Sequence, residues 1–272
     1  MQQATSPFDD IDYERRFAGV ARLYGAQGLA RFQQAHICVV GVGGVGSWVV
    51  EALARSAIGS ITMIDLDNVA ESNVNRQIQA TSLTLGKAKV TALAERIATI
   101  NPYCKVLEVE EFVEPDNLSQ MIGQHGFDYV IDAIDSVKAK TALIAYCREQ
   151  KIPLITIGAA GGQTDPCKIE ICDLSRTEQE PLLALVRKRL RQNFGFPRGS
   201  KSKFGIDAVF SMEALTMPET AETAEACAVD GSKGISGLNC AGFGSSIVVT
   251  ASFGLAAAAH VLRKLAFEKN VD

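Results

Sequence analysis

Short apolar runs alternate along the chain with longer segments in which apolar side chains recur at helical spacing, and this alternation begins at His36. The short runs are rich in β-branched residues and predict strands at 36–41, 60–65, 105–110, 128–133 and 153–158. The longer segments predict helices at 45–57, 83–99, 116–123 and 138–150. Strands that alternate with helices form βαβ units with right-handed crossovers, so we expect a mainly parallel sheet.

The two ends of the chain depart from this alternation. Residues 1–35 carry a helical pattern, and the chain after Gly162 predicts a strand at 168–173, a helix at 178–192 and loops at 195–206 and 217–239. The fold class is therefore α/β, with a Rossmann-like, doubly wound sheet. The expected parts are an N-terminal helical arm (1–35), the sheet domain (36–162) and a smaller C-terminal α+β lobe (163–272).

A glycine-rich turn, Gly41-Val42-Gly43-Gly44-Val45-Gly46, follows the first predicted strand and opens the first helix of the sheet domain. Glycines allow the backbone to approach a phosphate closely, and a helix N-terminus presents free N–H groups. Asp65 ends the next predicted strand, where a carboxylate can accept hydrogen bonds from a ribose. These features predict a nucleotide site.

The residues beyond Asp65 indicate which nucleotide is bound. Asp67, Asn73, Arg76 and Lys89 follow it, and the last of these lies near the start of a predicted helix. Arginine binds phosphate through a planar fork and lysine as a point charge, so the group suits a triphosphate better than a nicotinamide. The alternative is a surface turn followed by a lysine at a helix start.

Asp135 lies just past the strand predicted at 128–133, at the edge of the sheet where phosphates are expected. A carboxylate there can hold Mg²⁺ against the phosphates. It can also cap the helix that begins near residue 138, and one residue could serve both roles.

These motifs occur together in a known order and resemble the ubiquitin-activating-like superfamily, which adenylates carboxylates with ATP. The matching segments are Gly-x-Gly-Gly-x-Gly, Asp-x-Asp, Ser-Asn-x-x-Arg-Gln, Gly-x-x-Lys, Ile-Asn-Pro and Asp-x-x-Asp-Ser. The resemblance implies that Asp65 binds the ribose, with Asp67 in the same site. It also implies that Asp135 carries Mg²⁺ or positions phosphate. The remaining implied nucleotide ligands are Gly41, Gly43, Gly44, Asn73, Arg76 and Lys89.

Within that superfamily the chain is similar to the bacterial tRNA threonylcarbamoyladenosine dehydratases. The likeness is carried by residues 18–25, 129–137, 144–148, 159–163 and 239–244. It implies that ATP activates the threonyl carboxylate on a modified adenosine beside the tRNA anticodon, after which a nitrogen of the same side chain closes a ring. The implied catalytic residues are Arg76, Lys89, Asp135 and an arginine lent across a homodimer, Arg22 or Arg16. The resemblance also implies that the C-terminal lobe serves substrate binding and dimerisation. The seven scattered cysteines, odd in number and not preceded by a signal peptide, favour a reducing cytoplasm over a disulfide framework.

The charge balance of the chain limits its partners. A net charge of −4 argues against a generally basic nucleic-acid binder. Residues 181–206 nevertheless contain no acidic residue and carry Arg187, Lys188, Arg189, Arg191, Arg198, Lys201 and Lys203. This basic segment predicts either a footprint for the tRNA backbone or a solvated helix face with a basic loop.

The cysteine pattern decides between neighbouring functions. Relatives that activate ubiquitin-like sulfur carriers usually hold zinc with two Cys-x-x-Cys pairs, and this chain has none among its seven cysteines. We therefore expect no zinc and rank a sulfur-carrier adenylating enzyme second, ahead of a non-catalytic nucleotide sensor and a dehydrogenase. Cys227 and Cys240 are interpreted as structural or incidental. A cysteine desulfurase partner and a monovalent cation stay open as implications of the resemblance.

The segment Ala241–Leu262 contains no Asp, Glu, Lys or Arg and is long enough to span a bilayer. Its serines, threonine, histidine and glycines weaken that interpretation. We expect a helix buried under the sheet, with a membrane span as the less favoured alternative.

Overall fold

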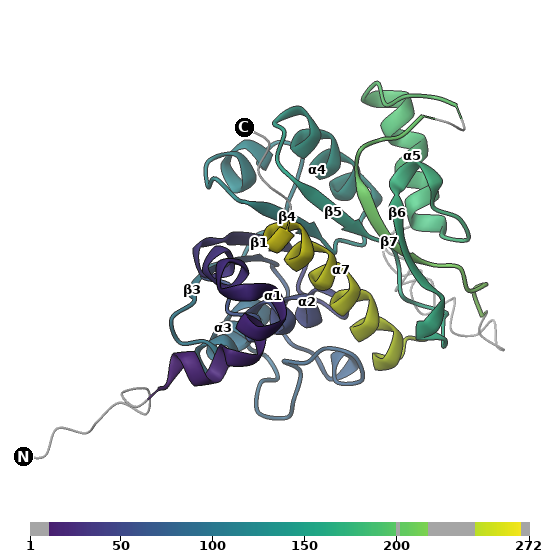
Figure 1. Ribbon diagram of the computed structural model, residues 1–272. Coiled ribbons are helices and arrows are strands. Elements are labelled where there is room, and N and C mark those ends of the chain that lie inside the picture. The colour runs from purple at the N-terminus through teal and green to yellow at the C-terminus, as the bar shows by residue number, and fades with distance from the viewer. Residues whose placement is uncertain (1–10, 200–201, 217–242, 268–272) are drawn as a thin grey trace, which may run out of the picture.

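The computed structural model describes residues 11–199, 202–216 and 243–267, and a twisted sheet forms its centre (Figure 1). The strand order is β3 (Lys105–Val109), β2 (Ser60–Ile64), β1 (His36–Val40), β4 (Tyr129–Asp132), β5 (Leu154–Ile157), β7 (Asp207–Ser211) and β6 (Ile169–Asp173). All neighbouring strands are parallel except β6 and β7, which are antiparallel. The predicted α/β class with a doubly wound, mainly parallel sheet is confirmed.

Helices cover both faces of the sheet (Figure 1). One apolar core joins it to α1 (Tyr13–Gln34), α2 (Gly46–Arg55), α3 (Lys89–Ile100) and α7 (Ile247–Phe267). A second core joins the other face to α4 (Val137–Glu149), α5 (Pro181–Asn193) and the π-helical turn η2 (Ser119–Gly123). Short 3₁₀ turns complete the elements: η1 (Glu71–Asn73), η3 (Pro166–Lys168) and η4 (Leu174–Arg176).

Two predicted helices differ from the structure. The segment predicted as a helix at 83–99 is helical only from Lys89. Gly86 adopts a φ of +81° in the preceding turn, and the apolar Leu83, which contributed to the pattern, is 90% exposed. The segment at 116–123 forms a single π-helical turn instead of a regular helix.

The C-terminal part of the described chain joins the central sheet. Strand β7, which the sequence pattern did not reveal, lies between β5 and β6 and pairs with both. The strands beyond residue 163 extend the same sheet. The domain boundaries expected at residues 36 and 163 stay predictions. The loop expected at 217–239 lies outside the described residues.

Helix α7 crosses the N-terminal end of α2 at very short range. A Cβ atom on Gly254 would lie 2.6 Å from the carbonyl oxygen of Val45 and 2.9 Å from Cβ of Trp48, so this crossing requires glycine. Because Val45 belongs to the glycine-rich turn, α7 supports that turn from behind. The predicted burial of this helix is confirmed in part: half of its most apolar window is buried, although its length and composition would also suit a membrane span.

Candidate active site

A cavity of about 620 Å³ opens at the carboxyl ends of β1 and β4. The strand order reverses direction between these two strands, which is where doubly wound folds bind ligands. The cavity is lined by every residue predicted to contact the nucleotide: Gly41, Gly43, Gly44, Asp65, Asp67, Asn73, Arg76, Lys89 and Asp135. The structure therefore brings together the residues that the motifs singled out.

The glycine-rich turn leaves the floor of this cavity open. Gly41 has a φ of +83° and packs against the carbonyl of Ala133, which a side chain would disturb. A Cβ atom on Gly46 would lie 1.8 Å from the carbonyl oxygen of Gly41, so Gly46 serves the turn itself. At Gly43 the nearest atom to such a Cβ is 3.8 Å away, on Gln77. Gly43 therefore leaves free space at the floor of the cavity.

Asp65 is buried at the end of β2 and is fixed by the turns beside it. Its carboxylate accepts hydrogen bonds from the backbone N–H groups of Val42 at 2.8 Å and Asp67 at 2.9 Å. Burial raises the pKa of Asp65, and the positive charge of Lys89 opposes that rise. The carboxylate thus ties the glycine-rich turn to the end of β2 and faces the expected ribose position.

Lys89 is the first residue of α3, and its side chain is only 7% exposed. Its Nζ lies 2.6 Å from Oδ2 of Asp67 and 3.9 Å from Oδ1 of Asp65. The two carboxylates compensate the ammonium charge. A bound triphosphate would offer the same ammonium a further negative partner.

Arg76 lines the same cavity and packs on the glycine-rich turn. A Cβ atom on Gly44 would lie 3.1 Å from Cδ of Arg76, so the glycine makes room for the arginine. The guanidinium donates to the carbonyl oxygen of Ser72 at 2.6 Å and to Oδ1 of Asn75 at 2.9 Å. Its burial lowers the pKa of Arg76. Asn73 orders this turn by accepting the N–H of Ala70 at 3.1 Å.

Asp135 lies exposed at the rim of the cavity, between β4 and α4. The capping role considered for it belongs instead to Ser136, whose Oγ accepts the N–H of Ala139 at 3.5 Å. Within the described residues, no hydrogen bond or ion pair occupies the Asp135 carboxylate. It is therefore chemically suited to a hydrated Mg²⁺, which binds through one or two carboxylates and phosphate oxygens.

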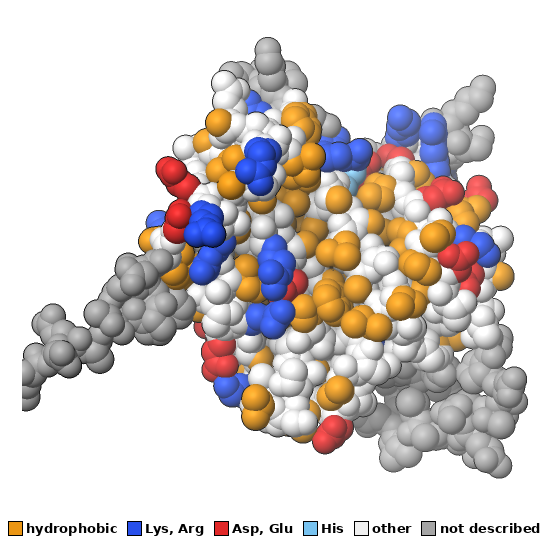
Figure 2. All heavy atoms as spheres, turned by 60° about the horizontal axis from the view of Figure 1, so that its bottom comes forward, with side chains coloured by type: hydrophobic (Ala, Val, Ile, Leu, Met, Phe, Trp, Pro, Cys, Tyr) orange, Lys and Arg blue, Asp and Glu red, His pale blue; other side chains and the backbone are white. Residues whose placement is uncertain are grey.

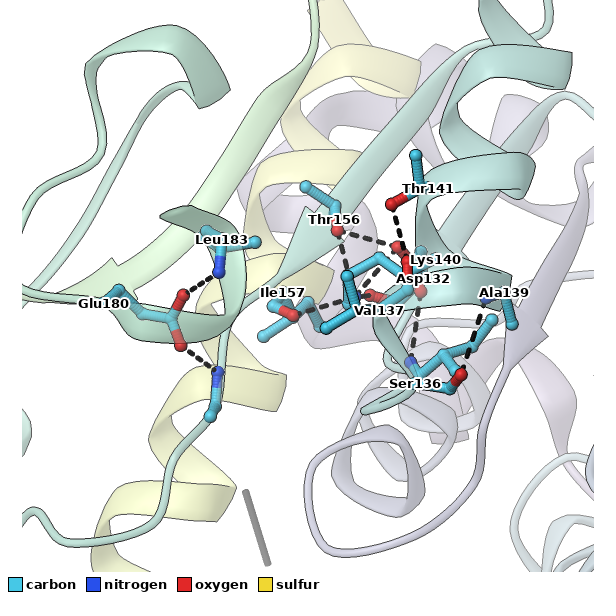
Figure 3. Close-up of polar contacts among 12 residues, drawn as sticks. Asp132, Ser136, Val137, Ala139, Lys140, Thr141, Thr156, Ile157, Glu180 and Leu183 are labelled. Atoms are coloured by element: carbon cyan, nitrogen blue, oxygen red, sulfur yellow. Dashed lines mark hydrogen bonds and ion pairs between the residues drawn. The ribbon is translucent and has the colours of Figure 1, made fainter. Parts of the chain in front are cut away.

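A buried ion pair that the sequence analysis missed links α4 to β4 (Figure 3). Lys140 and Asp132 are both fully buried, and the ammonium lies 2.9 Å from Oδ2 of the carboxylate. The ammonium also donates to Oγ1 of Thr156 at 3.1 Å and to the carbonyl oxygen of Ile157 at 3.0 Å. The network joins the carboxyl ends of β4 and β5 where they border the cavity. A lysine inside an otherwise apolar helical stripe was the available signal.

Glu180 is a second buried group that the sequence analysis missed (Figure 3). Its carboxylate accepts N–H groups from Leu182 and Leu183 at the start of α5 and from Ala159, which lines the cavity. Burial raises the pKa of Glu180 despite these bonds. Its place immediately before Pro181 is a helix-start pattern that could have revealed the cap.

The arginines considered for catalysis across a dimer do not line the cavity of their own chain. Arg22 is exposed on α1. Arg16 donates to the carbonyl oxygens of Thr99 and Ile100 at the end of α3, so it already has a structural role. Cys227 and Cys240 lie outside the described residues. The described residues form no group of three or more His, Cys, Asp or Glu side chains suited to a metal ion.

Comparison with protein families places this geometry in a known group. The model of the ThiF family matches residues 13–271, which is nearly the whole chain. The chain belongs to the ThiF family. This confirms the resemblance carried by the glycine-rich turn and by the residues that follow Asp65.

Within the ThiF family, the chain is similar to proteins of one named activity. The curated tRNA threonylcarbamoyladenosine dehydratase of Haemophilus influenzae is 51% identical over 260 residues, which are 95% of this chain and 96% of that protein. The Escherichia coli protein of the same name is 52% identical over 255 residues, covering 93% and 94%. A crystal structure of the E. coli dehydratase in complex with ATP aligns with a TM-score of 0.83 at 50% identity, covering 93% of this chain and 94% of that one.

Proposed function

We propose that this protein is an ATP-dependent tRNA threonylcarbamoyladenosine dehydratase. The observation that carries the proposal is the sequence identity to two tRNA threonylcarbamoyladenosine dehydratases. It is 51% and 52%, over almost the full length of both chains in each comparison. A solved relative of the same name holds ATP. In this chain, the residues expected around a nucleotide gather in one cavity.

The reaction requires one activation and one ring closure. An oxygen of the threonyl carboxylate attacks the α-phosphorus of ATP, and the bond from that phosphorus to pyrophosphate breaks. The urea nitrogen on the adenine side (N6) then attacks the activated carbonyl carbon and loses its proton, which closes a five-membered ring, and AMP leaves with the carboxylate oxygen. The elements of water thus leave the nucleoside in AMP and pyrophosphate. No protein nucleophile is needed, so catalysis depends on alignment and charge.

The cavity supplies the groups that this chemistry needs. Asp65 is placed to accept ribose hydroxyls, while the glycine-rich turn at the start of α2 receives phosphate. Lys89 and Arg76 would neutralise charge on the leaving pyrophosphate. Asp135 would hold Mg²⁺, which draws charge from the phosphate oxygens when it is bound.

A homodimer is part of this proposal, with Arg22 as the residue lent to the partner's cavity. Support comes from the apolar surface along α7, where Ile247, Val248 and Leu255 are exposed. Figure 2 shows hydrophobic side chains gathered on the side of the molecule that is turned forward. A cytoplasmic location, expected from the scattered cysteines, is also part of the proposal. The described residues hold nothing that tests the cysteine desulfurase partner, the monovalent cation or the absence of zinc, so these stay predictions.

The proposal is tested with purified protein, ATP and tRNA that does or does not carry threonylcarbamoyladenosine. We expect ATP–pyrophosphate exchange and loss of one water from the nucleoside, measured by mass spectrometry, only with the modified tRNA. Exchange that is independent of tRNA and stimulated by a ubiquitin-like carrier protein would overturn the proposal in favour of carrier activation.

A further inference from the structure

We propose that a second cavity, between helices α4 and α5, holds the single-stranded RNA beside the reacting nucleoside. This inference rests on the proposed function and names a binding site for that substrate. The cavity measures about 730 Å³ and is bounded by α4, α5 and the turn 194–196 that follows α5. We call it the α4–α5 groove.

The α4–α5 groove continues from the nucleotide cavity. Pro115 and Lys138 line both spaces, so the two form one connected surface. Lys138 lies in the first turn of α4, three residues after Asp135 at the rim of the nucleotide cavity. A strand lying in the groove would therefore place its next nucleotide beside the site proposed for ATP.

The charges of the groove favour a polyanion. Lys138, Arg148 and Arg189 line it and are exposed, while Glu149 is the acidic residue among the lining side chains. The described part of the chain shows no ion pair between these three cations and an acidic side chain. Exposed cations without such partners can replace the counterions of RNA phosphates. Among the basic side chains of segment 181–206 that the structure describes, Arg189 is the one that lines the groove.

Aromatic side chains in the groove favour single-stranded RNA over a duplex. Phe194 is 46% exposed although it lies in the groove, and Tyr146 is partly exposed beside it. Arg148 lies over the ring of Phe196 at 4.0 Å, which forms a flat cationic platform. Unpaired bases stack on aromatic rings and on arginine planes, and anticodon-loop bases are unpaired. An acidic peptide would use the cations but would leave the Phe194 ring without a stacking partner.

The test measures binding of a fluorescent anticodon stem-loop RNA by anisotropy at several salt concentrations. Phe194→Ala should weaken binding by about tenfold, because one stacked base is lost. Phe194→Trp keeps an aromatic ring at this position and should bind the RNA about as tightly as the wild type. Arg189→Gln should weaken binding and lower the salt dependence by about 0.7 in logarithmic slope, the value for one single-strand phosphate contact.

Lys188→Gln is the matched control for Arg189→Gln. It removes a positive charge from the neighbouring position of the same helix, but Lys188 does not line the groove. It should leave the salt slope close to the wild-type value. ATP affinity, measured by calorimetry, should be unchanged in all four variants and shows that each one folds.

The outcomes separate this inference from the proposed function. If the wild type dehydrates modified tRNA while Phe194→Ala and Arg189→Gln bind RNA as the wild type does, the groove is not the RNA site and the inference is wrong. If the wild type yields no dehydrated nucleoside, the proposed function itself fails. Equal losses in Lys188→Gln and Arg189→Gln would reduce the effect to general surface charge and would also overturn the inference.

Discussion

Lys89 is the buried cation of the nucleotide cavity. Its ammonium lies 2.6 Å from Asp67 and 3.9 Å from Asp65, and Lys89 is the first residue of α3. A charge held in place before the reaction stabilises a transition state without having to reorganise. The position of Lys89 therefore matters as much as its charge.

We expect Lys89→Met to lower the rate of ATP–pyrophosphate exchange by about 100-fold or more, since one preorganised group opposite the developing charge is lost. Lys87→Met is the matched control, because Lys87 is two residues away and pairs with Glu95 at the surface. It should change the rate by less than about twofold. Equal effects of the two changes would contradict the assigned role.

At the scale of elements, the walls of the site depend on contacts between strands that are distant in the sequence. Lys140 of α4 is paired with Asp132 of β4 and also bonds to Thr156 and Ile157 of β5. Removing one member of such a pair leaves an uncompensated buried charge, whereas removing both does not. The network thus resists partial loss.

We expect Lys140→Met to lower the free energy of unfolding by about 3–5 kcal/mol, measured with urea. Asp132→Asn in the same chain should recover part of this loss, because the orphaned charge is removed. Lys138→Met, on an exposed position of the same helix, should stay within about 0.5 kcal/mol of the wild type. Additive losses in the double variant would argue against a coupled pair.

The pairing of β7 with α7 predicts a response to acid. Asp207 Oδ2 lies 2.9 Å from His260 Nε2, and this hydrogen bond lowers the pKa of Asp207 below its ordinary 3.8. A depressed carboxyl pKa stabilises the fold above the unfolded value, and that contribution is lost as the pH falls through the folded value. When the pH is lowered below about 4, the free energy of unfolding should therefore fall less in Asp207→Asn than in the wild type. Urea unfolding at several pH values measures this difference.

Asp116→Asn, a change at an exposed carboxylate, is the control for this acid response. It should keep the pH dependence of the wild type. An unchanged slope in Asp207→Asn would show that the contact with His260 does not contribute.

The sequence revealed the local features well and the long-range ones poorly. The glycine-rich turn, Asp65 and Asp135 follow strands directly, so spacing alone placed them at one edge of the sheet. Strand β7 was missed because its position is set by pairing with β5 and β6, which are far away in the chain. Lys140 and Glu180 were missed because burial of a charge depends on partners from other elements.

At the scale of the whole molecule, one side of α7 stays exposed and apolar. Half of its most apolar window is buried against the sheet and neighbouring helices, while Ile247, Val248 and Leu255 face outward. Exposed apolar patches mark surfaces for other proteins or for membranes. In the proposed homodimer, a second copy of the chain covers this surface. Such a dimer is needed if Arg22 acts in the cavity of the partner subunit.

We expect Leu255→Glu to convert a dimer into a monomer, measured by light scattering after size-exclusion chromatography. The glutamate would bury its charge against the apolar surface of the partner subunit, which destabilises the interface. Leu83→Glu is the matched control, because Leu83 is 90% exposed on the turn before α3. A wild type that is monomeric, and that floats with lipid vesicles through α7, would contradict the dimer.

The crossing of α7 over α2 also sets the order of events during synthesis. Val40 is the first described residue that lines the nucleotide cavity, and Thr250 is the last. The glycine-rich turn leaves the ribosome long before Gly254 arrives to pack against Val45. A chain that stops before α7 lacks the cavity residue Thr250 and the helix that packs on the glycine-rich turn. We therefore expect ATP to protect the full chain, and not such a truncated form, against proteolysis.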